Sequence, residues 1–136
     1  MNWEYSCGAV VFTRQNGQIL YVIVQEKSGA YSFPKGHMEG SETEMDTARR
    51  EISEETGLQP AFLPGFCHRE EYHLSEKPGT WKRVTYFLAE FENQSLVAQE
   101  SEIRNILLLP YEQAYSLFPY ENTRQVLAAA HAFLTK

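Results

Sequence analysis

The sequence has few cysteines and lacks long hydrophobic runs. No run of about 18 apolar residues occurs, which argues against a membrane-spanning helix. The opening residues Met-Asn-Trp-Glu-Tyr lack the basic and apolar regions of a secretory signal peptide, so we expect none. The two cysteines, Cys7 and Cys67, are expected to be buried free thiols rather than a disulfide. Together these absences predict a cytoplasmic protein.

An excess of basic residues is also absent. Lysine and arginine number 12 against 18 acidic residues, which gives a net charge of −6. Broad nucleic-acid binding needs a basic face, so this balance argues against it. A polyphosphate ligand stays possible, because bound divalent cations would supply positive charge locally. The chain of 136 residues, 43% of them hydrophobic, is long enough to bury a core and is expected to form one domain over residues 1–136.

The order of the expected elements indicates the fold class. Apolar runs between turn residues predict strands at residues 4–13, 19–26, 81–92 and 106–109, with residues 95–100 as a candidate continuation of the third. Residues 61–75 are expected to be extended and irregular. Turns are expected at Asn16-Gly17 and Pro78-Gly79. Helices are expected at 42–56, 111–118 and 123–134, the last with Asn122 as N-cap. This order predicts an α/β fold, a mixed sheet with helices on both sides.

The helix expected at residues 42–56 has recognisable ends. Ser41 is a suitable N-cap, with Glu44 three residues later as its capping-box partner. Gly57 can adopt the left-handed conformation that ends many helices. Met45, Ala48 and Ile52 recur at helical spacing and are expected to face the core.

A second face of this helix carries three carboxylates. Glu51, Glu54 and Glu55 are spaced i, i+3 and i+4, so they lie close together and repel one another. One interpretation is a solvated acidic face, eased by Arg49 and Arg50. The other is a cation site, because clustered carboxylate oxygens suit Mg²⁺ or Mn²⁺. The glycine turn at a fixed offset before the helix favours the cation site.

Residues 36–58 follow the pattern G-x5-E-x7-R-E-I-x-E-E-x-G-L. This segment resembles the Nudix box, the signature of hydrolases that act on nucleoside diphosphates linked to another moiety. The resemblance implies an α/β/α sandwich with a mixed sheet. It also implies two or three Mg²⁺ or Mn²⁺ ions, held by Glu51, Glu54, Glu55 and the carbonyl of Gly36.

The resemblance also implies roles in catalysis. Divalent ions would bridge phosphate oxygens while water attacks phosphorus in line. Glu54 and Glu102 are alternative bases for the proton of that water. Glu102 is also an outer metal ligand by resemblance, with Glu100 as the other candidate for that position. Arg50 is expected to orient Glu51. Glu42 either does likewise or only complements the helix dipole.

Motifs outside the box are similar to those of the asymmetric diadenosine tetraphosphate hydrolases of the animal and archaeal type. The matching segments are Ser6-Cys7-Gly8-Ala9, Pro34-Lys35-Gly36-His37, Arg69-Glu70-Glu71-Tyr72 and Tyr86-Phe87-Leu88-Ala89-Glu90. Tyr31-Ser32-Phe33 and Phe87 depart from that pattern, because those enzymes usually have tryptophan there.

These motifs add candidate substrate-binding residues. By resemblance Lys35 and Lys82 contact phosphate, although each could be a solvated lysine. Adjacent residues on a strand point to opposite faces, so only one of Lys82 and Arg83 can reach the site. His37 is a candidate for phosphate contact or for packing. Tyr72 and Tyr120 are candidate base-stacking residues, whereas Tyr5, Tyr21 and Phe91 are interpreted as structural.

Three functions stay open at this stage. The first is hydrolysis of a dinucleoside polyphosphate, a small nucleotide, to a nucleoside triphosphate and a monophosphate. The second is another Nudix substrate: an oxidised or ordinary nucleoside triphosphate, a capped RNA end, a diphosphoinositol polyphosphate or another nucleoside diphosphate derivative. The third is a Nudix-fold binding module without activity, which the complete box disfavours.

Overall fold

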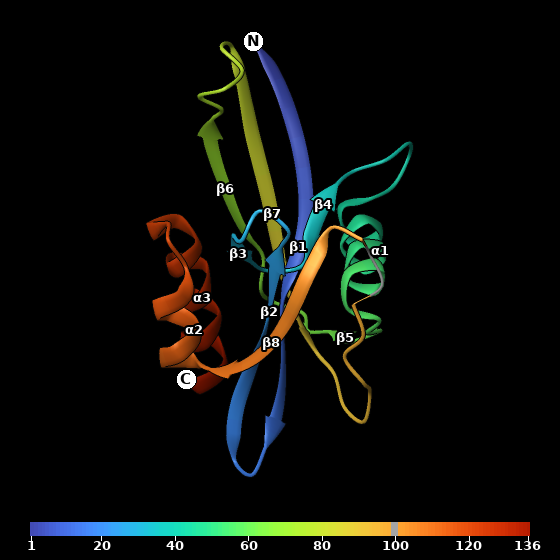
Figure 1. Ribbon diagram of the computed structural model, residues 1–136, viewed down its shortest axis with the longest axis vertical. Helices are drawn as coiled ribbons and strands as arrows, with labels where there is room; N and C mark the ends of the chain where they lie inside the picture. Colours follow the sequence, from blue (N-terminus) through green and yellow to red (C-terminus); the bar gives the residue numbers. More distant parts are fainter. Residues whose placement is uncertain (99–100) are drawn as a thin grey trace.

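The computed structural model describes residues 1–98 and 101–136, and it shows a mixed sheet between two helical layers (Figure 1). The strands are β1 (Asn2–Gln15), β2 (Gln18–Glu26), β3 (Tyr31–Ser32), β4 (Lys35–His37), β5 (Ala61–Phe62), β6 (His68–His73), β7 (Thr80–Glu90) and β8 (Ile103–Pro110). The helices are α1 (Glu44–Thr56), α2 (Tyr111–Leu117) and α3 (Glu121–Thr135). Helix α1 covers one face of the sheet, and α2 and α3 cover the other. The predicted fold class is confirmed.

The long strands β1 and β7 form the centre of the sheet. They pair in parallel from Asn2–Thr80 to Phe12–Glu90, whereas the other strand pairs are antiparallel. The strand order is β3-β2-β1-β7-β5, with β4 beside β1, β6 beside β7 and β8 beside β2. In Figure 1 the start of β1 and the β6–β7 hairpin extend beyond the helical layers.

The expected hairpin joins β1 to β2. Asn16 and Gly17 have φ values of 52° and 77°, the left-handed pair that a tight two-residue hairpin requires. The second expected turn is also present, and Gly79 within it has a φ of 80°.

Side chains alternate between two cores, one on each face of the sheet. Val10 and Phe12 pack toward Val126 and Leu127 of α3, whereas Ala9 and Val11 pack toward Ile52 of α1. We call these sides the α3 face and the α1 face. The alternation fixes which face each residue of β1, β6 and β7 occupies.

Helix α1 begins later than expected. Thr43 is its N-cap and exchanges capping-box hydrogen bonds with Asp46, so Ser41 and Glu44 are not the capping pair. Glu44 is turned toward the sheet instead, where its carboxylate accepts from Arg69 at 2.7 Å and from Thr85 at 2.6 Å. The C-terminal expectation is confirmed, since Gly57 caps the helix with a φ of 75°.

Other details differ from the sequence expectations. Helix α3 begins at Glu121 after Tyr120, without a side-chain cap from Asn122. Cys7 is buried but Cys67 is exposed, and both are free. Strand β7 ends at Glu90, and residues 91–98 form a loop instead of extending it, while residues 99–100 lie outside the described residues. No helix of residues 1–98 and 101–136 combines the length and hydrophobicity of a membrane span.

Candidate active site

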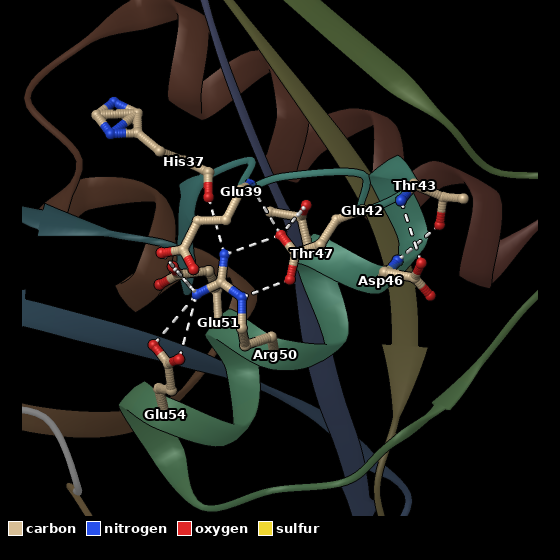
Figure 2. Close-up of polar contacts among 9 residues, drawn as sticks. All are labelled: His37, Glu39, Glu42, Thr43, Asp46, Thr47, Arg50, Glu51 and Glu54. Carbon is tan, nitrogen blue, oxygen red and sulfur yellow. Dashed lines mark hydrogen bonds and ion pairs between the residues drawn. The ribbon is translucent and has the colours of Figure 1, made fainter.

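Arg50, in the middle of α1, is the centre of a cluster of carboxylates (Figure 2). Its Nε donates to Glu42 Oε2 at 2.6 Å, and its Nη1 donates to Glu51 Oε2 at 2.8 Å. Nη1 also lies 3.2 and 3.3 Å from the two oxygens of Glu54. Nη2 donates to the carbonyl of His37 at 2.9 Å, which ties the helix to the end of β4. The guanidinium fork thereby holds three acidic side chains and the strand in one geometry.

Glu42 is held from several sides as well as by Arg50. Its Oε1 accepts from the Thr47 hydroxyl at 2.8 Å and from the Glu39 N–H at 3.0 Å. The hydrogen bond from Arg50 is the main cause that lowers the pKa of Glu42 from its ordinary 4.5 to about 2. The hydrogen bond to Glu42, with smaller contributions from those to Glu54 and Glu51, raises the pKa of Arg50. Glu42 therefore accepts hydrogen bonds that fix the orientation of Arg50, a role beyond complementing the helix dipole.

Gly36 allows Glu51 to approach the backbone of β4. A Cβ at Gly36 would overlap the carboxylate of Glu51, so the glycine leaves the space that this carboxylate occupies. Glu51 is only 8% exposed, although carboxylate side chains are rarely buried. A buried carboxylate held against a strand backbone by an arginine is an unusual core feature, and it indicates a built site.

The oxygens of this cluster suit a hard divalent cation. Glu51 and Glu55 are each 8% exposed, and Glu54 lies on the exposed side of the same helix. In residues 1–98 and 101–136 no group of three His, Cys, Asp or Glu side chains already converges as a metal-binding set. Two features therefore indicate that the cluster could hold a divalent cation. Carboxylate oxygens are the donors that Mg²⁺ prefers, and the space left by Gly36 fixes one carboxylate, that of Glu51, beside a strand backbone.

A cleft of about 530 Å³ lies on the α3 face, opposite the carboxylate helix. Lys35, Tyr72, Lys82 and Tyr120, four of the predicted substrate-binding residues, line it together. Tyr72 and Lys82 are direct neighbours across the β6–β7 pair. Tyr120 precedes α3 and is 71% exposed, so its ring is available to a ligand. The volume is in the range that small-molecule sites occupy.

The cleft contains both lysine and glutamate side chains. Burial is the main cause that lowers the pKa of Lys82, and the nearby Lys35 lowers it further. Burial also raises the pKa of Glu70, which lines the same cleft. Within the described residues Glu70 Oε1 is buried without a hydrogen-bond partner. The two lysines thus lie in the cleft beside three glutamates, Glu26, Glu70 and Glu76.

Strand β4 connects the cleft to the carboxylate cluster. Lys35 pairs with Gly8 and lines the cleft, whereas the next residue, Gly36, contacts Glu51 on the α1 face. A ligand bound by Lys35 would therefore lie one residue away from the cluster.

The side chains of the remaining predicted residues join neither the cleft nor the carboxylate cluster. His37 is exposed, and its ring lies 3.8 Å from Glu4. Glu102 is exposed just before β8, and its backbone carbonyl accepts from Lys27 at 2.9 Å. Glu100 lies outside the described residues. Arg83 points away from the cleft and donates to Glu71 at 2.7 Å.

Two residues of the site were missed by sequence reasoning. Glu70 stands two residues before Tyr72, so a strand over residues 68–73 would have placed both on one face. Glu44 was assigned to a helix cap, but it joins α1 to β6 and β7. The sequence offered no signal for that contact, because it spans 25 and 41 residues.

The chain belongs to the NUDIX domain family, whose model matches residues 5–130. Within this family it is similar to asymmetrical bis(5'-nucleosyl)-tetraphosphatases. The protein of Sus scrofa is 31% identical over 141 residues, covering 95% of this chain and 94% of the relative. The protein of Mus musculus is 29% identical with the same coverage.

A solved structure supports the same fold. The Ap4A hydrolase of C. elegans, in a binary complex, superposes with a TM-score of 0.88 at 24% identity, covering 96% of this chain and 97% of that one. The agreement extends along nearly the whole chain.

Proposed function

We propose that this protein is a metal-dependent hydrolase that cleaves dinucleoside polyphosphates asymmetrically, for example diadenosine tetraphosphate to ATP and AMP. The observation that carries the proposal is the position of β4 between the aromatic cleft and the carboxylate helix. Similarity to asymmetrical bis(5'-nucleosyl)-tetraphosphatases over 95% of the chain supports the choice of substrate. The free thiols of Cys7 and Cys67 fit a cytoplasmic setting.

The α1 carboxylates and the Gly36 carbonyl would hold two or three Mg²⁺ or Mn²⁺ ions, with Glu102 as an outer ligand. Such ions, when bound, neutralise charge on phosphate oxygens and make a water more acidic. Arg50 keeps Glu51 and Glu54 in position, and this fixed geometry reduces the reorganisation that the reaction needs. Glu54 or Glu102 accepts the proton of the attacking water.

The cleft would hold one nucleoside and its adjoining phosphates. Tyr72 and Tyr120 stack on the base, since flat rings bind any base by its face. Lys35 and Lys82 bind phosphate oxygens, and Lys35 directs the chain of phosphates toward Gly36. Water then attacks one phosphorus, a nucleotide leaves, and the products are a triphosphate and a monophosphate.

A substrate panel tests this proposal. Purified protein with Mg²⁺ is offered diadenosine tetraphosphate, ordinary and oxidised nucleoside triphosphates, capped RNA and sugar nucleotides. We expect the dinucleotide to yield equal amounts of ATP and AMP. Turnover of triphosphates alone would assign a different Nudix substrate, and the absence of any metal-dependent turnover would indicate a binding module.

In the same assay, Glu54→Gln tests whether the carboxylates of α1 take part in catalysis. It should lower kcat by several orders of magnitude, because it removes one of the carboxylates proposed to hold the metal ions and one candidate base. The matched control is Glu112→Gln, the same change at an exposed position of α2. Equal rates in the two variants would remove Glu54 from the mechanism.

A further inference from the structure

Aromatic side chains lie exposed on the α1 face, on the opposite side of the sheet from the cleft. Trp3 and Tyr5 of β1 stack with their ring centroids 6.3 Å apart and their planes at 11°. Trp81 of β7 lies beside Trp3, with 6.1 Å between ring centroids. Trp3 is 37% exposed and Tyr5, interpreted from the sequence as structural, is 43% exposed. We call Trp3, Tyr5, Trp81 and Arg83 the aromatic platform.

Arg83 adds an oriented guanidinium, ion-paired with Glu71, to the platform. Its guanidinium carbon lies 5.7 Å from the centroid of the Trp3 ring and 5.6 Å from that of Tyr5. Its Nε donates to Glu71 at 2.7 Å, which fixes the orientation of the side chain. Flat apolar rings beside an oriented guanidinium match a ligand that joins a planar ring to a phosphate.

The platform lies close to the carboxylate helix. Tyr5 and Cys7 point to the same face of β1, and Cys7 pairs with Gly36, which contacts Glu51. At about 3.3 Å per residue, Tyr5 lies about 7 Å and Trp3 about 13 Å along β1 from Cys7. The N–H of Met38 donates to the carbonyl of Tyr5 at 3.1 Å, so the chain leaving β4 runs beside the platform. This spacing is comparable to the reach of one nucleotide from its phosphates to its base.

We propose that the aromatic platform binds the second nucleoside of a dinucleoside polyphosphate whose first nucleoside occupies the cleft. The proposal rests on the proposed function. The cleft and the platform lie on opposite faces of the sheet, with β4 and the Glu51 carboxylate beside Gly36 between them. A substrate with two nucleosides joined by phosphates has the same arrangement, because its two bases are flat groups and its polyphosphate chain would lie between them at the α1 carboxylates. The net charge of −6 disfavours an RNA chain as the occupant.

Tryptophan fluorescence gives a direct readout of this site. The chain has two tryptophans, Trp3 and Trp81, and both belong to the platform, so all tryptophan emission arises there. With Mg²⁺ present, a non-hydrolysable methylene-bridged analogue of diadenosine tetraphosphate should quench this emission at saturation. Adenosine tetraphosphate, which has one base, should quench it far less, because the cleft takes that base. Equal quenching by both ligands, or none by the dinucleotide analogue, would contradict the proposal.

Kinetics with substitutions at Trp3 give a second test. Trp3→Leu keeps apolar bulk but removes the stacking ring, so KM for the dinucleotide should rise about tenfold relative to KM for adenosine tetraphosphate. Trp3→Tyr restores a flat ring and should recover most of that loss, which a merely structural defect would not show.

The remaining outcomes separate the two proposals. If the parent protein does not hydrolyse the dinucleotide, the proposed function fails. If it does, and Trp3→Leu changes KM equally for both substrates, only the platform assignment fails. Exposed rings could instead pack against a second copy of this chain. Sedimentation of the parent and of Trp3→Leu tests this alternative. If the parent is a dimer and Trp3→Leu is a monomer, the nucleoside assignment is overturned.

Discussion

The carboxylate of Glu51 lies against the backbone of Gly36, in the space that a side chain at Gly36 would fill. Gly36→Ala should therefore displace Glu51 rather than fit beside it. A shift of about 1 Å in a catalytic group can lower the rate about 100-fold, so we expect a loss of kcat on that scale. Steady-state kinetics at saturating Mg²⁺ measure this loss.

A double-mutant cycle shows whether the overlap is the cause. In a Glu51→Ala background no carboxylate remains beside the strand, so Gly36→Ala should lower the melting temperature much less than it does in the parent. Equal destabilisation in both backgrounds would mean that the backbone of β4, and not Glu51, requires the glycine.

Arg50→Lys tests the guanidinium fork. Lysine cannot bridge Glu42, Glu51 and the His37 carbonyl at once, because its ammonium is a single point of charge. We expect the free energy of unfolding to fall by about 2 kcal/mol and kcat to fall about 10-fold to 100-fold. Chemical denaturation and initial rates provide the two measurements.

The control is Arg49→Lys at the adjacent position, where the guanidinium lies over the ring of Phe62 and a lysine ammonium can do the same. Matching losses in both variants would argue against a special role for the fork.

The Glu42–Arg50 contact predicts a pH dependence of stability. The pKa of Glu42 is about 2 in the folded protein, below its ordinary 4.5. A carboxylate with a lowered pKa stabilises the fold above its unfolded pKa and loses this contribution as pH falls toward the folded pKa. The difference in melting temperature between the parent and Glu42→Gln should therefore be constant above about pH 5 and shrink between about pH 4.5 and pH 2. A difference that is independent of pH would show that Glu42 acts through packing rather than charge.

The sequence predicted the elements better than it predicted their connections. The spacing of apolar residues located α1 and the long strands, and Asn16-Gly17 located the hairpin, because these signals are local. The N-cap of α1 was wrong because Ser41 and Thr43 are both good caps, and a contact of Glu44 with the distant Thr85 decided between them.

The candidate site shows the same division between local and distant information. The spacing of Glu51, Glu54 and Glu55 placed them on one helix, and the structure adds that Arg50 fixes the geometry of Glu51 and Glu54. The exposure of Tyr5 followed from the extension of β1 and β7 beyond the helices, which no local pattern encodes. Glu102 stays a prediction, because its side chain joins neither the cleft nor the carboxylate cluster in the described residues.

Tyr120 offers a test of the cleft that does not disturb the core. It is 71% exposed, so Tyr120→Ala should leave the melting temperature nearly unchanged, since little buried area is lost. Loss of one stacking partner should raise KM for the dinucleotide about tenfold, with a smaller effect on kcat. Tyr120→Phe keeps the ring and should behave like the parent, which separates stacking from a role of the hydroxyl. If Tyr120→Ala and the parent had the same KM, the base would bind the cleft without Tyr120, and Tyr72 would be left as the predicted stacking residue there.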